Sequence, residues 1–352
     1  MKDSERTIEF EFVRATENAA LNAMHWIGRG DKEAADAAAC DAIYGVFDLV
    51  DIRGEVMIGE GIKDNAPGIF LGEHLGTWKE DAPYFDIALD PIDGTTNISK
   101  GMDNSISVMA AAEASSPGTV MKNIPSYYAH KLAYGPVVAT AIRKFHVTDN
   151  WLDQDLSETI QFVARVLGKR VGEVVVLVLD RPRNQPFVDQ VRAVGATLRM
   201  VADGDVTAAV APSLPESGVD LYVGIGGTPE GILTAAALRT LGGDIQLRPW
   251  FRDNAERHDL CGSLSDEELM YVHTAADLVP GDSAIFCATG ITDSPLLPGV
   301  KMIGKTATTH SILMRARSRT VRYIRAVHNL DHKLIHLRSV HGDHIIGESQ
   351  SG

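Results

Sequence analysis

Residues 87–97 read Ile-Ala-Leu-Asp-Pro-Ile-Asp-Gly-Thr-Thr-Asn, so Asp90 and Asp93 follow a short apolar run. Pro91 fixes one backbone angle between the two carboxylates, and Gly94 gives the next turn a freedom that a side chain would deny. Carboxylate oxygens followed by hydroxyls and backbone N–H groups suit a hard divalent cation and a phosphate together. Turns favour the same residue types, but a turn that only reversed the chain would not need both aspartates and two threonines. We therefore treat this segment as a candidate site for metal ions and phosphate.

Three further carboxylates lie near the ends of predicted elements. Asp36 lies just inside a helix, Glu60 lies between two glycines after a strand, and Glu230 lies at the start of a helix. Each has a simpler explanation, because a carboxylate in the first turn stabilises a helix by about 0.3–1 kcal/mol, and Glu60 could be a solvated loop residue. The metal interpretation gains weight because several acids follow apolar strands, where open α/β sheets bind ligands. A cluster of acids would also repel itself unless cations lay between its members.

The first part of the chain reads as two helices followed by strands. Apolar residues recur at helical spacing over residues 8–28, and an alanine-rich helix is predicted over residues 32–50. Asp31 can cap that second helix. Strands are predicted over residues 55–59, 85–89 and 105–112.

The rhythm changes after about residue 147. A continuous apolar run over residues 173–180 is typical of a strand buried on both faces. Strands and helices then alternate, which indicates a parallel α/β sheet. Residues 246–282 show no clear pattern, and we expect irregular structure there. The further predicted elements are helices over 186–195 and 229–241 and strands over 197–201, 219–224 and 283–288.

These patterns predict the α/β class, with an N-terminal α+β domain followed by a mostly parallel α/β domain. The predicted boundaries are residues 1–150 for a metal-binding domain, 151–330 for a substrate domain and 331–352 for a polar tail. Several histidines near the C-terminus are spaced four apart, but a mobile terminus lacks the ordered scaffold that a metal site needs. We therefore assign no metal to them.

Composition narrows the classes of partner. The chain has 352 residues, 45% hydrophobic and 23% charged, as in a globular protein. Its formal net charge of −14 argues against a nucleic-acid partner. No long apolar span or signal-peptide pattern is present, so we expect no membrane partner and a cytoplasmic location. The three cysteines match no zinc or disulfide framework, and buried reduced thiols are expected.

Five segments together resemble the class II fructose-1,6-bisphosphatases, from about residue 9 to about residue 330. In the family's order and spacing they are residues 26–36 (Trp-Ile-Gly-Arg-Gly-Asp-Lys-Glu-Ala-Ala-Asp), 58–61 (Ile-Gly-Glu-Gly), 90–95 (Asp-Pro-Ile-Asp-Gly-Thr), 203–205 (Asp-Gly-Asp) and 224–231 (Gly-Ile-Gly-Gly-Thr-Pro-Glu-Gly). The third segment is shared with the wider lithium-sensitive phosphatase superfamily, which includes inositol monophosphatases. The segments around Asp36 and Glu230 are specific to class II.

The resemblance implies a layered sugar-phosphatase fold, a sugar bisphosphate substrate, Mg²⁺ or Mn²⁺ as cofactor, and a homo-oligomer such as a dimer or tetramer. The implied metal ligands are Asp36, Glu60, Asp90, Asp93 and Glu230. The implied substrate contacts are Asp93, Gly94, Thr95, Tyr128, Arg181, Pro182, Arg183, Asp203, Gly204, Asp205 and Gly227. The candidate catalytic residues are Thr95, Glu60, Asp64, Asp31 and Lys32.

The chemistry of these residues suits metal-assisted hydrolysis of a sugar phosphomonoester. In typical two-metal sites, ions about 3.5–4 Å apart clamp the phosphate and activate a water molecule. Thr95 would orient that water, and the guanidinium groups of Arg181 and Arg183 suit a second phosphate. Asp203 and Asp205 could accept hydrogen bonds from sugar hydroxyls. Asp31, Lys32 and Asp64 are candidates for charge tuning or proton transfer.

The sequence also departs from the family pattern. Ile62 and Asn65 stand where the family commonly has acids, Asp93 replaces a glutamate of many members, and Arg181 stands where some members have lysine. Any third metal or base that depended on the first two positions is therefore in question. The segment 127–131 also differs from the usual pattern.

Three alternatives to a fructose-1,6-bisphosphatase of gluconeogenesis or carbon fixation stay open at this point. The first is dual activity that includes sedoheptulose 1,7-bisphosphate. The second is a phosphatase for inositol phosphates or phosphoadenosine nucleotides, against which the class II segments and the arginine pair argue. The third is a non-catalytic sugar-phosphate sensor, which would be expected to lose a metal ligand, whereas all five acidic positions keep carboxylates.

Overall fold

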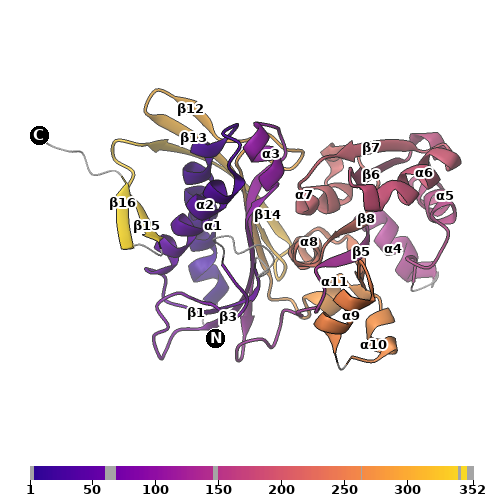
Figure 1. Ribbon diagram of the computed structural model, residues 1–352, viewed down its shortest axis with the longest axis horizontal. Coiled ribbons are helices and arrows are strands. Elements are labelled where there is room, and N and C mark those ends of the chain that lie inside the picture. The colour runs from indigo at the N-terminus through magenta and orange to yellow at the C-terminus, as the bar shows by residue number, and fades with distance from the viewer. Residues whose placement is uncertain (1–3, 60–68, 146–149, 263, 340–341, 347–352) are drawn as a thin grey trace, which may run out of the picture. The chain divides into compact units, whose positions relative to one another are not determined.

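The chain forms two compact units in the computed structural model (Figure 1), which describes residues 4–59, 69–145, 150–262, 264–339 and 342–346. Unit 1 comprises residues 1–121 and 283–352, and unit 2 comprises residues 122–282. This division differs from the predicted boundaries at 150 and 330. Residues 128–134 pair with strands of unit 2, and residues 285–290 pair with a strand of unit 1. Long-range strand pairing therefore sets the boundaries between the two units. The change to alternating strands and helices after about residue 147 does not mark them.

Unit 1 is built on an eight-stranded sheet of order β12-β13-β11-β4-β3-β1-β2, with β14 paired to β13. Only β1 and β3 run parallel, and the other neighbours are antiparallel. Short connections join β12 to β13 and β13 to β14, and connections of this length suit antiparallel pairing. The strands are β1 Arg53–Ile58, β2 His74–Leu75, β3 Tyr84–Asp93, β4 Ile106–Ala114, β11 Ile285–Gly290, β12 Lys301–Ile303, β13 Thr306–Arg315 and β14 Thr320–Asn329.

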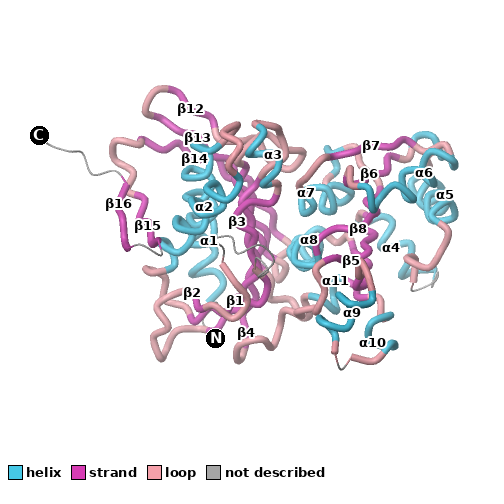
Figure 2. The backbone as a smooth tube through the Cα atoms, in the orientation of Figure 1, coloured by secondary structure: helices cyan, strands magenta, loops and turns pink. Residues whose placement is uncertain are grey.

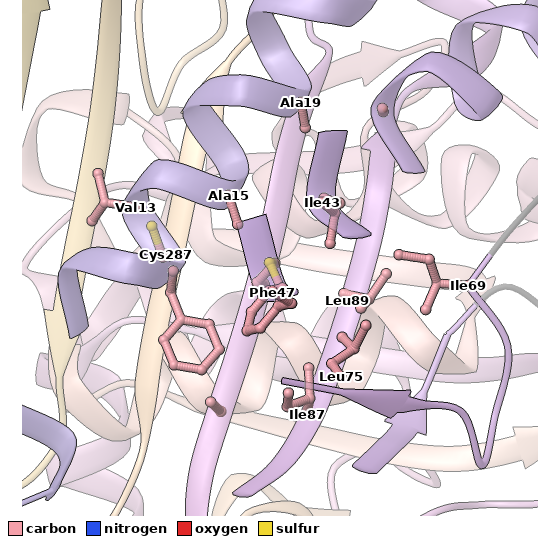
Figure 3. Packing of buried hydrophobic residues seen from close by; sticks show 14 of the residues in the cluster. Val13, Ala15, Ala19, Ile43, Phe47, Ile69, Leu75, Ile87, Leu89 and Cys287 are labelled. Carbon is pink, nitrogen blue, oxygen red and sulfur yellow. The ribbon is translucent and has the colours of Figure 1, made fainter. Parts of the chain in front are cut away.

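Helices α1 (Ser4–Ala23) and α2 (Lys32–Phe47) pack against each other and against this sheet. Their alanines allow close approach, and larger side chains such as Phe12 and Phe47 fill the space between the helices and the sheet, where their rings meet edge to face. Figure 3 shows this core, in which Ile43 and Phe47 of α2 lie near Ile87 and Leu89 of β3. The predicted buried thiols are confirmed, since all three cysteines are free and buried.

The sequence predicted only a polar tail over residues 331–352, but this segment contains two strands. Strands β15 (Ile335–Ser339) and β16 (Gly342–Ile346) form a hairpin, and β15 packs against α2. Ile335 and Leu337 are buried with apolar residues of α1 and α2. A Cβ at Gly45 would lie 1.9 Å from the carbonyl oxygen of His336, so α2 needs glycine there. Alternation of apolar and polar residues in such a short strand is a weak signal, which is why the hairpin was missed.

Unit 2 is built on a six-stranded sheet of order β10-β9-β5-β8-β6-β7. The α/β class is confirmed, but only β8, β6 and β7 run parallel, whereas β5, β9 and β10 join antiparallel. The prediction of a mostly parallel sheet was therefore wrong for half of the strands. The strands are β5 Tyr128–Tyr134, β6 Val175–Leu179, β7 Thr197–Val201, β8 Leu221–Gly227, β9 Asp244–Trp250 and β10 His273–Thr274.

Helices cover the sheet of unit 2 in two groups, as the ribbon and tube views show (Figure 2). The helices α4 (Pro136–Phe145), α5 (Leu156–Leu167) and α6 (Gln185–Val194) share one apolar cluster with alternate residues of β5, β6 and β8. The helices α7 (Asp205–Val210), α8 (Thr228–Leu241) and α11 (Ala275–Leu278) pack together, and α7 and α8 contact β5 and β8.

The segment 246–282 is more regular than predicted. It contains most of β9, strand β10 and the helices α9 (Asn254–Cys261), α10 (Asp266–Met270) and α11. Side-chain caps begin each of these helices, from Asp253, Ser265 and Thr274 respectively. Caps of this kind satisfy the first backbone N–H groups, but helices of four to eight residues show too little periodicity to be read from sequence.

Asp86 of β3 holds the last loop of unit 1 before the chain enters unit 2. It is fully buried and accepts hydrogen bonds from the backbone N–H groups of Gly118 at 2.8 Å, Val120 at 2.7 Å and Met121 at 3.0 Å. Hydrogen bonds to a charged acceptor are each worth about 1.5–3 kcal/mol. The carboxylate therefore fixes a loop that has no regular secondary structure of its own.

The variant Asp86→Asn should lower the free energy of unfolding by about 2–4 kcal/mol, because an amide removes the charge and turns an N–H group towards backbone donors. Urea unfolding followed by circular dichroism measures the change. The exposed Asp81, in the same unit, gives a matched control, and Asp81→Asn should unfold like the unmodified chain. Equal unfolding midpoints for the two variants would contradict this role for Asp86.

Candidate active site

Asp90 and Asp93 lie at the end of β3, on the turn that leads into α3 (Thr95–Lys100). The pairing of β3 with β4 shifts register between these two residues, so the strand is irregular where the carboxylates emerge. Asp90 is partly exposed, and its Oδ1 accepts a hydrogen bond from the N–H of Ile92 at 3.0 Å, while Asp93 is 3% exposed. The local backbone therefore sets the direction of Asp90 before any ligand is present.

Gly94 makes this turn possible. Its φ is 104°, in the left-handed region that favours glycine. A Cβ there would lie 2.5 Å from the carbonyl oxygen of Asn104. The carbonyl of Gly94 accepts hydrogen bonds from Ser105 Oγ and from the N–H groups of Asn97 and Ile98. Thr95, the candidate for orienting water, opens α3 and is partly exposed.

Asp36 is held by a helix whose start is tied to α3. The N–H of Gly28 donates to the carbonyl of Ile98 at 2.8 Å, and that of Gly30 donates to Ser99 at 2.9 Å. Asp36 is 7% exposed and lies in the second turn of α2. Helix α2 also packs against β3, so these contacts place Asp36 on an element that is fixed against the β3–α3 turn.

Asp31 and Lys32 lie at the first turn of α2. The carboxylate of Asp31 caps the helix by accepting a hydrogen bond from the N–H of Ala34 at 2.9 Å, and Lys32 is exposed. Capping explains the aspartate without a proton-transfer role. Glu60, Asp64 and the departures Ile62 and Asn65 lie outside the described residues.

In unit 2, Asp205 and Glu230 lie beside a glycine pair at the end of β8. Asp205 begins α7, is 5% exposed and accepts hydrogen bonds from Lys131 Nζ, Tyr222 Oη and the N–H of Gly227. A Cβ at Gly226 would lie 2.0 Å from Oδ2 of Asp205, and one at Gly227 would lie 1.9 Å from Oε2 of Glu230. Both glycines are therefore required for the carboxylates to approach the backbone.

The predicted phosphate contacts lie after β6. Pro182 opens a short 3-10 helix (Pro182–Asn184). Arg183 donates through Nε to the carbonyl of Ile225 at 2.9 Å, and its guanidinium carbon lies 4.4 Å from the ring centroid of Tyr128. Cation–π contacts of this kind hold the guanidinium plane in one orientation. Arg183 and Tyr128, both predicted substrate contacts, are thus brought together.

Arg181 and Asp203 also meet, since Nη2 of Arg181 lies 3.1 Å from Oδ1 of Asp203. Both side chains are partly exposed. Gly204, with a φ of 88°, then turns the chain so that Asp203 and Asp205 have different surroundings. Asp203 stays accessible, whereas Asp205 is buried.

The carboxylates fit divalent metal ions by the chemistry of their donors, because Mg²⁺ and Mn²⁺ prefer carboxylate oxygens. Within the described residues, which omit Glu60, no three His, Cys, Asp or Glu side chains form a group that could hold a metal ion. The structure thus groups Asp90 and Asp93 on one turn and brings Glu230 to a helix start, and it leaves the complete ligand set as a prediction.

Sequence reasoning missed three residues that shape unit 2. Asn184 is fully buried and bonds to the carbonyl of Leu179 and to the N–H and carbonyl of Ile225, which joins β6 to β8 beyond their paired residues. Lys131 and Tyr222 are the buried partners of Asp205. The available signal was Lys131, which is followed by the apolar Leu132 and Ala133. A lysine in such a stretch points to a buried partner, since lysine is almost never fully buried unless paired.

The comparison with known proteins decides the family. Residues 6–328 match the model of a family described as bacterial fructose-1,6-bisphosphatase, glpX-encoded. The chain belongs to this family. It is 37% identical over 344 residues to fructose-1,6-bisphosphatase 1 class 2 of Escherichia coli strain K12, which covers 93% of this chain and 97% of the relative. The same values hold for fructose-1,6-bisphosphatase class 2 of Shigella flexneri.

Membership of the class II fructose-1,6-bisphosphatases confirms the resemblance seen in the five segments. The matched region includes every residue singled out as a candidate for metal, substrate or catalysis, and the two large sheets except Asn329 at the end of β14. Among the described residues, no helix is long and apolar enough to cross a membrane.

The variant Gly226→Ala should lower kcat about 100-fold, because misplacement of a site by about 1 Å can cost that much, and the new methyl group would displace Asp205. A phosphate-release assay on purified protein measures the loss. Gly172 is a matched control in the same unit, since a Cβ there would meet only the carbonyl oxygen of Gly195, at 3.4 Å. Activity of Gly226→Ala equal to that of Gly172→Ala would contradict the need for glycine.

Proposed function

We propose that this chain hydrolyses the 1-phosphate of fructose 1,6-bisphosphate, giving fructose 6-phosphate and phosphate, with Mg²⁺ or Mn²⁺ as cofactor. The observation that carries the proposal is the family match over residues 6–328. The retained carboxylates at the implied ligand positions support it, as does the rigid turn that presents Asp90 and Asp93.

Asp36, Glu60, Asp90, Asp93 and Glu230 would hold the metal ions. When bound, such ions lower the pKa of a water molecule and offset charge on the leaving oxygen. The hydroxyl of Thr95 orients the attacking water for in-line displacement at phosphorus. The buried position of Asp93 limits its motion, which favours one ligand geometry over several.

Unit 2 supplies groups that suit the distal phosphate and the sugar. The guanidinium of Arg183 is fixed by Ile225 and Tyr128, so it loses little freedom when it binds a phosphate. Arg181 and Asp203 form a partly exposed ion pair, whose charges stay available to a phosphate and to a sugar hydroxyl respectively. These roles make a bisphosphate the favoured substrate over a monophosphate.

The family is named for fructose 1,6-bisphosphate, and the arginine pair also suits the distal phosphate of sedoheptulose 1,7-bisphosphate. We keep dual activity as an outcome of the substrate test. We likewise propose a homodimer or homotetramer and a cytoplasmic role in gluconeogenesis or carbon fixation. Light scattering of the purified protein measures the oligomeric state.

Phosphate release from fructose 1,6-bisphosphate should require Mg²⁺ or Mn²⁺ and should fall roughly 100- to 1,000-fold in Asp90→Ala, since the ligand stabilises developing charge through the metal. The measurement titrates each metal with fructose 1,6-bisphosphate, sedoheptulose 1,7-bisphosphate and inositol 1-phosphate. Asp81→Asn serves as the control with unchanged activity. Release from inositol 1-phosphate alone would move the protein to a different substrate class, and no release from any substrate would favour a sensor.

Arg183→Ala should raise KM for fructose 1,6-bisphosphate about 10- to 100-fold, because a charge-assisted hydrogen bond to phosphate is worth about 1.5–3 kcal/mol. The same variant should change KM for fructose 1-phosphate little, since that substrate lacks the distal phosphate. Steady-state kinetics with both substrates gives the comparison. Arg199→Ala is the control, because Arg199 is an exposed arginine of unit 2 that bonds to the carbonyl of Ser217. An equal rise in KM for both substrates would place Arg183 elsewhere in the reaction.

A further inference from the structure

Lys131 of β5 is a lysine without solvent exposure. Its side chain is 0% exposed, and Nζ lies 2.7 Å from Oδ2 of Asp205, itself 7% exposed at the side chain. A buried ammonium is stable as a charge only beside a carboxylate that compensates for the lost water. Lys131 and Asp205 therefore form a buried ion pair in the core of unit 2, whereas the pair of Arg181 and Asp203 is partly exposed.

Tyr222 completes the surroundings of Asp205. In the antiparallel pairing of β5 with β8, Lys131 lies opposite Gly224 and Ala133 lies opposite Tyr222, so Lys131 and Tyr222 are diagonal neighbours on one face. The phenol donates to Oδ1 of Asp205 at 2.6 Å. Burial raises the pKa of Tyr222 well above its usual value, and the charge of Asp205 raises it further. The phenol thus stays protonated and acts as a donor.

The same carboxylate reaches the start of α8. Oδ2 of Asp205 accepts the N–H of Gly227 at 2.9 Å, and Gly227 is the residue that precedes α8. A Cβ on Gly231, in the first turn, would lie 3.5 Å from Cε of Lys131. Glu230 lies between these two glycines, and its charge is close enough to act on the pKa of Tyr222. The helix start that carries Glu230 is thus hydrogen-bonded to Asp205 through Gly227, and the side chain of Lys131 lies near its first turn.

We propose that Lys131, Asp205 and Tyr222 form a buried positioning network that fixes the Gly226–Gly227 turn and thereby the carboxylate of Glu230 for metal binding. The inference rests on the proposed role of Glu230 as a metal ligand. Asp205 then acts through the protein, because its two oxygens are engaged by Lys131, Tyr222 and Gly227, and in this network it is a positioning residue.

The test is direct Mn²⁺ binding, measured by the electron paramagnetic resonance of free Mn²⁺, together with thermal unfolding. The double variant Lys131→Met/Asp205→Asn removes both buried charges at once and should unfold near the temperature of the unmodified chain. It should nevertheless bind Mn²⁺ about 10-fold or more weakly, as expected when a residue that orients a metal ligand is lost. Tyr222→Phe, which keeps the ion pair, should weaken binding in the same direction.

Lys169 and Asp220 provide a matched control. They form a lysine–aspartate pair at 2.6 Å in the same unit, and Asp220 directly precedes the opposite end of β8. The variant Lys169→Met/Asp220→Asn should bind Mn²⁺ like the unmodified chain. This control loses the same two charges. If Mn²⁺ binding weakens only in the Lys131/Asp205 variant, the cause is therefore the position of the pair and not the loss of charge.

Glu230→Gln separates failure of the network from failure of the ligand assignment. If Glu230→Gln weakens Mn²⁺ binding while the Lys131/Asp205 double variant and Tyr222→Phe bind normally, the network is only structural and the inference is overturned. If Glu230→Gln itself binds normally, the ligand assignment fails and the inference fails with it. If the double variant does not fold, Tyr222→Phe alone decides between these outcomes.

Discussion

A buried carboxylate needs a donor or a cation beside it, and among the described residues this constraint shapes both units. Asp86 accepts hydrogen bonds from three backbone N–H groups, which fixes a loop, and Asp205 accepts from an ammonium, a phenol and a backbone N–H. Unpaired charge in a protein interior costs several kcal/mol. The arrangement of strands, glycines and caps therefore follows the acids as much as the apolar core.

Local pattern predicted the elements that have a strong period of their own. The strand Thr197–Val201 has the predicted bounds, and α6 and α8 begin and end within a residue or two of prediction. Strand direction and order could not be read in this way, because β5 joins β8 and β9 by pairing with residues 87 to 122 positions away in the chain. The hairpin of β15 and β16 pairs locally, but its alternation is weak and its contact with α2, distant in the chain, could not be read from spacing either.

The candidate site was predicted from residue types and from family resemblance, but the partners of those residues were not. The sequence placed Asp203 and Asp205 together as acceptors for the sugar, whereas one is partly exposed and the other is buried against Lys131. Gly204 between them adopts a left-handed backbone conformation, so the chain turns between the two aspartates. Burial and pairing depend on tertiary contacts, which no spacing along the chain reports.

Strands β4 and β11 are neighbours in one sheet, yet the whole of unit 2 lies between them in the chain. During synthesis on the ribosome, residues 122–282 emerge as an uninterrupted stretch and can complete their own sheet. The apolar faces of α1, α2 and β4 must meanwhile wait for β11 and β13, which are made only after unit 2. Nascent chains of this protein therefore carry a half-built N-terminal sheet for most of translation, the period in which chaperone binding would matter most.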